Sequence, residues 1–279
     1  MIDGGKVDLL GVAIDAVDYE AAIERVIAAA IAGEPFGVSA LAVHGVMTGH
    51  DDAEHRVRLN SLDLVTPDGQ PVRWALNLLH HVGLPDRVYG PRLTLDLCRE
   101  AAARNLPVFF YGSEQPILDR LAERLPRLVP GIMIAGTRPS RFDRATREEL
   151  DLICQEVRAT GARLCFVGLG CPRQEIFVSE NVGRLSMPTL AVGAAFAYLA
   201  GAASEPPLWV QRWGLQWLYR FTQDPRRLWR RYLLLNPRFC AGVLRQRRRG
   251  SPATPRPGRP QNQPQDHRRE SEPTFIGWA

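Results

Sequence analysis

The 279-residue sequence has no apolar run of eighteen residues, so it contains no candidate for a membrane-spanning helix. Its first ten residues, MIDGGKVDLL, lack the basic and then apolar order of a signal peptide. The five cysteines form no C-x-x-C pair and are odd in number, which favours free thiols in a reducing compartment. We therefore expect a cytoplasmic protein that is free or peripheral on the inner face of the cell membrane.

Two common devices of nucleotide chemistry are also missing. No D-x-D occurs, although many nucleotide-sugar enzymes chelate a metal ion with that carboxylate pair. The turn Gly168-Leu169-Gly170 lacks the third glycine of the dinucleotide fingerprint, which counts against a nicotinamide or flavin oxidoreductase. We expect neither a metal ion nor a cofactor in the reaction, so arginines must neutralise any phosphate charge.

Lysine is nearly absent, and the arginines that replace it are clustered. Between Ser204 and Arg249 the sequence has eleven arginines and two acidic residues, whereas the rest of the chain is net acidic. A basic cluster of this size favours phosphates, anionic lipid headgroups or nucleic acid. No nucleic-acid-binding motif accompanies it, so we predict no nucleic-acid partner.

Apolar, β-branched segments alternate with helical patterns as far as Gly201. The predicted strands are Val7–Ile14, Phe36–Val43, Leu62–Thr66, Pro107–Tyr111, Ile132–Gly136, Leu164–Gly168 and Thr189–Val192. The predicted helices include Tyr19–Ala32, Thr94–Asn105, Ile117–Leu125, Arg144–Thr160 and Pro172–Asn181. Because strands separated by helices need crossover connections, we predict an α/β fold with a Rossmann-like, largely parallel sheet and helices on both faces.

The sequence divides into three regions. Residues 1–201 form the predicted core, 202–249 a helical appendage, and 250–279 a polar, proline-rich tail that we expect to be disordered. Two helices of the appendage should meet at Asp224-Pro225, because Asp can cap a helix and Pro fits its first turn. Tryptophans interleaved with the arginines suit a helix lying on an anionic membrane, although a solvated charged face is the alternative. They are Trp209, Trp213, Trp217 and Trp229.

Candidate site residues follow the predicted strands, where parallel sheets bind ligands. Asp68 and Gly69 lie in a Pro-Asp-Gly turn directly after a strand. This is either a plain turn or a carboxylate placed to accept a proton from a hydroxyl group. In LCFVGLGCPRQE, Gly168 and Gly170 precede a helix opened by Pro172, and such a helix start can bind phosphate.

Other candidates have equally plain alternatives. Gln174 and Glu175 are either ordinary first-turn helix residues or hydrogen-bonding partners of a sugar or nucleoside. Arg87 precedes Gly90 in RVYG, and an arginine beside a glycine turn can neutralise a phosphate, although a lone arginine is usually solvated. Gly112 ends another strand, where it permits either ligand approach or a helix-start turn.

Taken in order, the segments TPDG, RVYG, FVGLGCPRQE, AVGAAFAYLAG and WVQRWGLQWLYRFTQDPRRLWRRY resemble the WecG/TagA/CpsF glycosyltransferases, glycosyltransferase family 26. The similarity extends from about Val7 to Phe239. It implies a Rossmann-like core with an appendage that helps to close the active site and dock on the membrane. It also implies inverting transfer of N-acetylmannosamine, its uronic acid or a related hexose from UDP to a polyprenyl-diphosphate-linked sugar, in cell-surface polysaccharide synthesis.

The resemblance also implies roles for particular residues. Asp68 would be the general base, and Gln174 and its neighbours would contact the donor. Arg220, Arg227 and Arg230 would stabilise the leaving diphosphate, with Arg231 as a further substrate-binding residue.

The sequence departs from the family pattern around the expected sugar. The T-x-N of the second strand is Ala40-Leu41-Ala42, followed by His44, which is either a substitute pocket group or a satisfied histidine. Aspartates of the family are replaced by Arg92 and Ala197, and an Arg-Ala-Pro by Glu205-Pro206-Pro207. We therefore expect a working transferase with altered sugar specificity, and the rival is a decayed transferase that serves as a membrane-associated assembly factor. The sequence does not determine whether the chain is a homo-oligomer.

Overall fold

The computed structural model of the chain describes residues 1–140, 145–207, 210, 213–223 and 225–250. For helical residues 220, 223 and 225–232 it describes the backbone alone. The predicted cap at Asp224 and the predicted disordered tail beyond Gly250 therefore lie outside the described residues.

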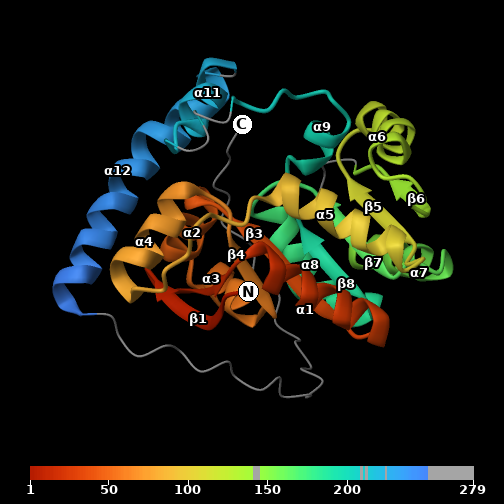
Figure 1. Cartoon of the computed structure of the whole chain (residues 1–279), viewed down its shortest axis with the longest axis horizontal. Coiled ribbons are helices and arrows are strands. Elements are labelled where there is room, and N and C mark those ends of the chain that lie inside the picture. The colour runs from red at the N-terminus through yellow and green to blue at the C-terminus, as the bar shows by residue number, and fades with distance from the viewer. Residues whose placement is uncertain (141–144, 208–209, 211–212, 224, 251–279) are drawn as a thin grey trace.

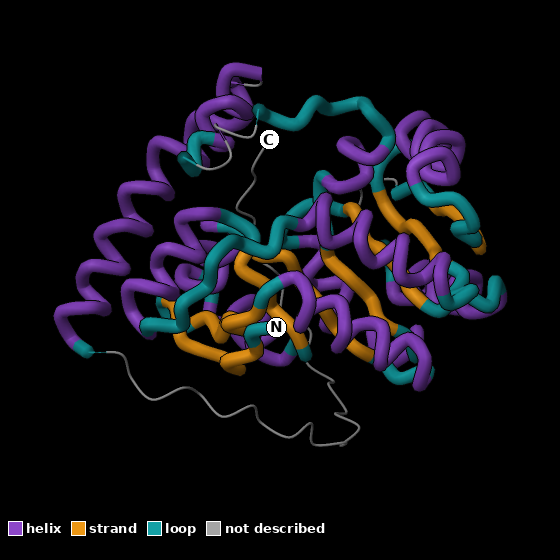
Figure 2. Tube along the Cα trace, in the orientation of Figure 1, coloured by secondary structure: helices purple, strands orange, loops and turns teal. Residues whose placement is uncertain are grey.

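Six parallel strands form the centre of the molecule in the order β4-β3-β8-β7-β5-β6 (Figures 1 and 2). They are β3 (Phe36–Leu41), β4 (Leu64–Pro67), β5 (Val108–Gly112), β6 (Ile134–Arg138), β7 (Leu164–Gly168) and β8 (Pro188–Ala191). The predicted parallel sheet is confirmed. The chain leaves β3 toward β4 on one side and later returns through β8 on the other, which opens a crevice at the carboxyl ends of these strands.

The predicted strand Val7–Ile14 is wrong, because two antiparallel strands occupy this region: β1 (Asp3–Leu9) and β2 (Val12–Val17). The turn between them has φ of 57° at Leu10 and 91° at Gly11. A leucine rarely adopts positive φ, so the apolar run concealed the turn. Buried Asp15 fastens this hairpin to the sheet, since its Oδ2 accepts a 2.7 Å hydrogen bond from the Val65 amide.

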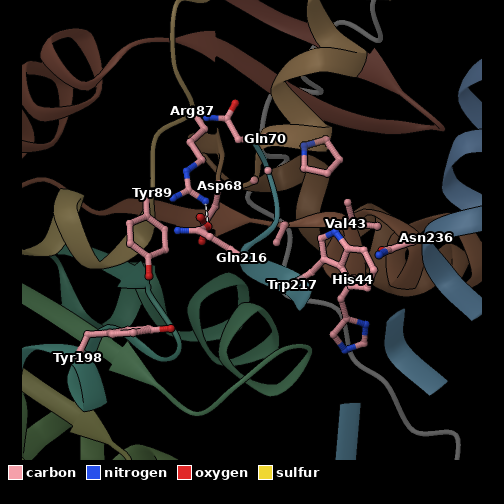
Figure 3. Close-up of a pocket in the computed structure, with 14 residues that line it drawn as sticks. Val43, His44, Asp68, Gln70, Arg87, Tyr89, Tyr198, Gln216, Trp217 and Asn236 are labelled. Carbon is pink, nitrogen blue, oxygen red and sulfur yellow. Dashed lines mark hydrogen bonds between the residues drawn. The ribbon is translucent and has the colours of Figure 1, made fainter. Parts of the chain in front are cut away.

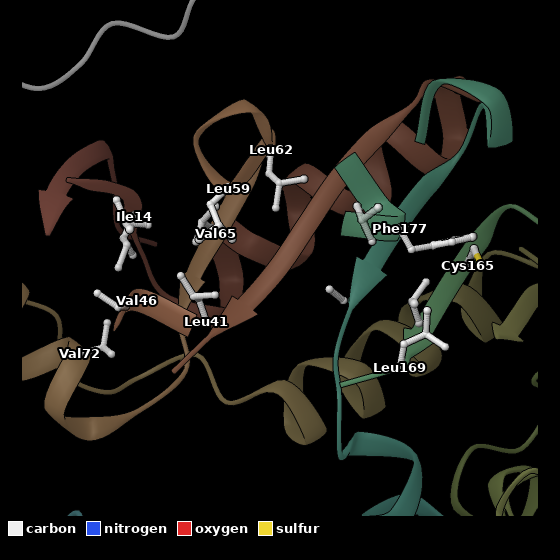
Figure 4. Close-up of a cluster of buried hydrophobic side chains, with 14 of the residues drawn as sticks. Ile14, Leu41, Val46, Leu59, Leu62, Val65, Val72, Cys165, Leu169 and Phe177 are labelled. Carbon is white, nitrogen blue, oxygen red and sulfur yellow. The ribbon is translucent and has the colours of Figure 1, made fainter. Parts of the chain in front are cut away.

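Helices cover both faces of the sheet, as predicted. The helices on one face are α1 (Tyr19–Ala32), α5 (Gly90–Ala103), α6 (Gln115–Leu128) and α9 (Ala195–Leu199). Their buried side chains and that face of the sheet form a first apolar cluster. On the other face, a second apolar cluster joins the sheet to α2 (Val43–Asp51), α3 (Ala53–Ser61), α4 (Gln70–His80), α7 (Arg147–Ala159) and α8 (Arg173–Leu185). Alternate strand residues supply the two clusters: Phe110 and Phe166 point to the first, Tyr111 and Val167 to the second. Figure 4 shows part of the second cluster.

The described part of the appendage includes the helices α11 (Gln216–Gln223) and α12 (Pro225–Arg249), whose bounds agree with the predicted division at Asp224-Pro225. In Figure 1, α12 runs along one side of the core, where it packs against α2 and α4. Buried Phe239 and Val243 join the second apolar cluster. Among the described helices, none combines the length and the apolar character needed to cross a bilayer.

Candidate active site

A cavity of about 110 Å³ lies at the carboxyl ends of β3 and β4, between the core and the appendage (Figure 3). The core lines it with Ala42, Val43, His44, Asp68, Gly69, Gln70, Pro71, Arg87, Tyr89 and Tyr198. The appendage lines it with Gly214, Gln216, Trp217 and Asn236. The structure thus brings four predicted site residues into one cavity: His44, Asp68, Gly69 and Arg87.

Asp68 is positioned by the end of β4. Its amide donates a 3.1 Å hydrogen bond to the Leu41 carbonyl of the neighbouring β3, and Gly69 then opens α4. Gly90 lies against the carboxylate, because a Cβ added there would be 3.4 Å from Asp68 Oδ2. The Pro-Asp-Gly turn therefore holds a carboxylate in the cavity wall, which is the geometry that a general base needs.

Arg87 links the Asp68 end of the cavity to the appendage. Its side chain is buried, it stacks over the Tyr89 ring at 4.3 Å, and it donates a short hydrogen bond to the Gln216 amide oxygen of α11. In Figure 3 the guanidinium group points toward Asp68. A cation next to the carboxylate and at the appendage boundary is suited to hold a phosphate.

Aromatic residues close the same end of the cavity. Tyr89 and Tyr198 meet edge to face with ring centroids 6.2 Å apart. Burial, and then the nearby Tyr198 and Asp68, raise the pKa of the Tyr89 hydroxyl, so it stays protonated at neutral pH. The Tyr89 amide donates to the Tyr19 hydroxyl at 2.8 Å, which fixes the loop that carries Arg87.

His44 lies at the opposite end of the cavity, near Trp217 and Asn236 (Figure 3). Its Nδ1 is 3.5 Å from the Thr48 hydroxyl, which also donates to the His44 carbonyl. The residue thus lines the cavity without standing beside Asp68 in it.

Two buried polar atoms of lining residues have no hydrogen-bond partner in the described part of the chain. They are Gln70 Oε1, an acceptor, and Gln216 Nε2, a donor. Buried polar groups are nearly always satisfied, so such a pair in a cavity wall suits a ligand that both donates and accepts, as sugar hydroxyls do.

The second predicted segment lies deeper than this cavity. Gly112 and Gly168 are paired residues at the ends of the neighbouring strands β5 and β7. A Cβ on Gly112 would lie 2.8 Å from the Gly168 backbone. Their close approach explains these glycines by strand packing. Gly170 and Pro172 follow in the turn into α8, for which Pro172 is the N-cap residue.

Gln174 and Glu175 are buried and joined to that turn. Gln174 Oε1 accepts from the Gly170 amide at 3.1 Å, and Gln174 Nε2 donates to Glu175 Oε1 at 2.8 Å. Burial raises the pKa of the Glu175 carboxyl group, opposed by hydrogen bonds that include those from Gln174 and Ser39. Both side chains hold the turn in shape, and neither lines the Asp68 cavity.

The departures from the family pattern have different surroundings. Ala42 lines the cavity, and Ala40 lies against Gly90, since a Cβ there would be 3.3 Å from that of Ala40. Arg92 instead stacks on the Tyr19 ring at 4.3 Å and pairs with Asp96, in a separate hollow between α1 and α5. Ala42 therefore changes the cavity wall, Ala40 lies beside it against Gly90, and Arg92 contributes to another surface.

Four predicted arginines have side chains outside the described residues. The backbone places Arg220 on α11, and Arg227, Arg230 and Arg231 on α12. Of the predicted membrane tryptophans, Trp213 is exposed and Trp217 lines the cavity. Trp209 and the side chain of Trp229 also lie outside the described residues.

Sequence reasoning missed Gln70, Tyr89, Tyr198 and Gln216. Gln70 and Tyr89 adjoin the motifs TPDG and RVYG, so their position beside a predicted site was the available signal. Tyr198 and Gln216 approach from α9 and α11, and no sequence spacing indicates that contact.

Comparisons with known proteins identify the family of the chain. The model of the glycosyl transferase WecG/TagA/CpsF family matches residues 7–253, so the chain belongs to that family and is a glycosyltransferase. A protein of Bacillus spizizenii is 32% identical over 192 residues, covering 68% of this chain and 71% of its own length. A Bacillus subtilis protein is 25% identical over 201 residues, with 71% and 75% covered. Each relative is named N-acetylglucosaminyldiphosphoundecaprenol N-acetyl-beta-D-mannosaminyltransferase.

Proposed function

We propose that the protein transfers an N-acetylhexosamine or a related hexose from a UDP-sugar to a polyprenyl-diphosphate-linked sugar, with inversion. The observation that carries this proposal is Asp68, a carboxylate in a cavity that the core and the appendage line together. Membership of a glycosyltransferase family supports the reaction class, and the names of the two relatives support the lipid-linked acceptor.

The proposed reaction is a single displacement. The acceptor hydroxyl oxygen attacks the anomeric carbon of the donor and forms the glycosidic bond, while Asp68 takes the hydroxyl proton. The bond from the anomeric carbon to the phosphate oxygen breaks, and its electron pair leaves with UDP. Attack opposite to the leaving group inverts the anomeric centre.

Arginines balance the charge on the leaving diphosphate in this scheme. Arg87 is buried beside the cavity and is the described candidate. Arg220, Arg227 and Arg230 are the further candidates that the family resemblance implies. Since the sequence has no D-x-D, we propose that fixed guanidinium groups replace the usual metal ion, and that transfer needs no added magnesium or manganese.

We expect the protein to use a donor sugar other than N-acetylmannosamine. Ala40 and Ala42 stand where the family resemblance implies a polar T-x-N, and Ala42 lines the cavity, so one hydrogen-bonding side chain is lost from its wall. A site that loses such groups discriminates less strongly for the matching hydroxyl or amide. We propose a related hexose donor for an exopolysaccharide, with no cofactor beyond the nucleotide sugar.

The appendage is also our candidate for docking on the inner face of the membrane. Leu218, Leu233 and Leu234 are exposed, and the end of α12 carries Arg245 and residues 247–249, all arginines. Exposed apolar side chains beside arginines suit the interface of an anionic bilayer. This position would bring the cavity to its lipid-linked acceptor.

The test is UDP release and product formation with a panel of UDP-sugars and a polyprenyl-diphosphate-linked N-acetylglucosamine acceptor, without added magnesium. We expect one donor to be used and Asp68→Asn to lose at least about a thousandfold in kcat while UDP binding is retained. The control is Asp119→Asn, which changes an exposed carboxylate on α6 and should keep full activity. Full activity of Asp68→Asn would contradict the base assignment, and no turnover with any donor would favour the decayed assembly factor.

A further inference from the structure

Three side chains with metal-binding atoms meet behind the Asp68 cavity. They are His55 on α3, Cys171 in the turn before α8, and Glu175 in the first turn of α8. Their ligand atoms all lie within 4.8 Å of one another. Local structure holds His55 in place, because the Asp52 side chain caps α3 by accepting a hydrogen bond from the His55 amide.

The cluster contains buried polar atoms that lack partners. His55 is only 1% exposed, and neither of its ring nitrogens has a hydrogen-bond partner among the residues that the structure describes. Glu175 is equally buried, and its Oε2 has no hydrogen-bond partner either. Leaving such atoms unsatisfied costs about 1–3 kcal/mol each, so their convergence on one small space calls for a ligand.

That ligand should be a cation. The side chains that hydrogen-bond the Glu175 carboxyl group are uncharged: the Gln174 amide, the Ser39 hydroxyl and the Cys171 thiol. A neutral imidazole offers one ring-nitrogen lone pair to a metal ion, and both ring nitrogens of His55 are buried in this cluster. A positive ion would compensate the buried carboxylate and use both the nitrogen and the oxygen that lack partners.

The ligand types select the metal. One imidazole nitrogen, one thiolate and one carboxylate oxygen form the mixed donor set that zinc accepts in a tetrahedral site. Zinc bonds of about 2.0–2.3 Å place ligand atoms about 3.3–3.8 Å apart, so the three atoms need to approach by about 1 Å. Cys171 is partly exposed, which leaves a path for the ion and room for a water molecule as the fourth ligand.

We propose that His55, Cys171 and Glu175 bind a zinc ion that fastens α3 to the turn between Gly168 and Glu175. Binding releases the proton of the Cys171 thiol to solvent, and the resulting thiolate and the Glu175 carboxylate balance the charge of the ion. The ion is structural and lies outside the reacting cavity. It would hold Glu175, whose Oε1 accepts from Gln174, and so fix the turn that Gln174 closes on Gly170.

Cobalt is the probe of choice, because cobalt(II) bound to a thiolate absorbs in the near ultraviolet and its tetrahedral complexes absorb visible light. The full-length protein is stripped with a chelator, dialysed, and titrated with Co²⁺. We expect one Co²⁺ ion to bind per chain and to give a thiolate charge-transfer band in the near ultraviolet and absorption in the visible. Both absorptions should disappear when Zn²⁺ is added. Since the measurement follows metal binding and not sugar transfer, its outcome is independent of the proposed reaction.

Matched variants identify the ligands. His55→Gln and Cys171→Ser should each weaken Co²⁺ binding at least tenfold, and Cys171→Ser should abolish the charge-transfer band. The controls are His81→Asn and Cys240→Ser, which change an exposed histidine and an exposed cysteine and should bind as the parent does. The far-ultraviolet circular dichroism of each variant reports whether it folds.

An experiment on the unaltered protein guards against variants that fail to fold. Zinc should protect Cys171 from iodoacetamide at least tenfold, whereas exposed Cys240 should react at the same rate with and without zinc. The proposal is overturned if the unaltered protein gives no thiolate-to-cobalt band, if folded His55→Gln and Cys171→Ser bind as the parent does, or if zinc leaves the alkylation of Cys171 unchanged.

Discussion

Because Gly90 has no side chain, it leaves space for the Asp68 carboxylate. A Cβ at this position would lie 3.3 Å from the Ala40 Cβ and 3.4 Å from both Asp68 Oδ2 and the Val192 carbonyl. The first distance is tighter than most Cβ contacts, the other two lie at the lower limit of ordinary contact, and the residue is buried. The glycine of RVYG therefore helps to position the carboxylate of TPDG, although seventeen residues separate the two motifs.

We expect Gly90→Ala to lower kcat roughly tenfold, because a displaced general base loses its alignment with the acceptor hydroxyl. The measurement is steady-state UDP release with saturating donor. Gly183→Ala is the control: a Cβ there meets nothing within 4 Å, and the exchange within α8 should stabilise the protein by about 0.5–1 kcal/mol. Equal activity of Gly90→Ala and the parent would show that the carboxylate tolerates the added methyl group.

At the scale of single residues, sequence reasoning found the groups that follow strands. Asp68 was predictable, because parallel strands deliver the residues that follow them to one edge of the sheet, and Arg87 was predicted as an arginine beside a glycine turn. The role of Gly112 was not predictable, because a glycine at the end of a strand allows either a ligand or a neighbouring backbone to approach. In the structure it is the backbone of Gly168 that approaches. The unpartnered nitrogens of His55 were also hidden, because lack of a partner is a property of packing.

Helix α12 is tied to the N-terminal hairpin by one buried side chain. Gln246 Oε1 accepts from the Leu10 amide at 2.9 Å, and Nε2 donates to the Asp8 carbonyl at 3.0 Å and to Asp8 Oδ2 at 2.8 Å. The first and last elements of the described chain are therefore joined by hydrogen bonds that an apolar side chain cannot replace.

We expect Gln246→Leu to destabilise the protein by at least about 2 kcal/mol, because it leaves the Leu10 amide and the Asp8 oxygens without their partner. Urea denaturation measures the loss, and amide hydrogen exchange should become faster along residues 233–249. Arg245→Gln, which changes an exposed neighbour, is the matched control. Unchanged exchange in Gln246→Leu would mean that apolar packing alone docks α12.

The same contact makes stability depend on pH. Burial raises the pKa of Asp8, opposed by the Gly11 amide, His80 on α4, the Gln246 amide and Arg56 on α3. A raised folded-state pKa means that the folded chain binds the proton more tightly than the unfolded chain. The contribution of Asp8 to stability is therefore full below its unfolded pKa, near pH 4, and is lost as pH rises through the folded-state value.

Asp8→Asn should remove this dependence. The difference in unfolding free energy between the parent and Asp8→Asn should shift in favour of Asp8→Asn as pH rises from about 4 to 7. Urea denaturation at several pH values gives the difference directly, and other carboxylates cancel because both proteins share them. A difference that stays constant across this range would contradict the raised pKa.

At the scale of elements, periodicity located most strands and helices but not the hairpin. Tyr19–Ala32 was predicted with the bounds that the structure has, because its cap Asp18 and the glycine after it mark both ends. The predicted strand Phe36–Val43 is two residues too long, because β3 ends at Leu41. Helix α2 begins at Val43 with no capping side chain. Where polar caps are missing, an apolar run hides the boundary.

For the whole molecule, the outer surface of the appendage combines apolar and basic side chains. Leu244 follows Leu233 by eleven residues, about three helical turns, so both lie on one face of α12. Leu233 is 58% exposed, and Leu234 and Leu244 are 53% exposed. With the arginines that end the helix, this face has the composition of an interfacial helix, although it is too polar to enter the bilayer.

We expect the protein to bind vesicles of phosphatidylglycerol but not vesicles of phosphatidylcholine. Binding should weaken as the salt concentration rises. Sedimentation with vesicles measures this partition. Replacing both Leu233 and Leu234 by serine should weaken binding at least tenfold, since inserting one leucine contributes about 1.5–3 kcal/mol and 1.4 kcal/mol is a factor of ten. Leu152→Ser is the matched control, because Leu152 is similarly exposed but lies on α7, on the core. If the double serine variant and Leu152→Ser bind equally, α12 does not lie on the lipid. The lipid-linked acceptor would then have to reach the Asp68 cavity from another face.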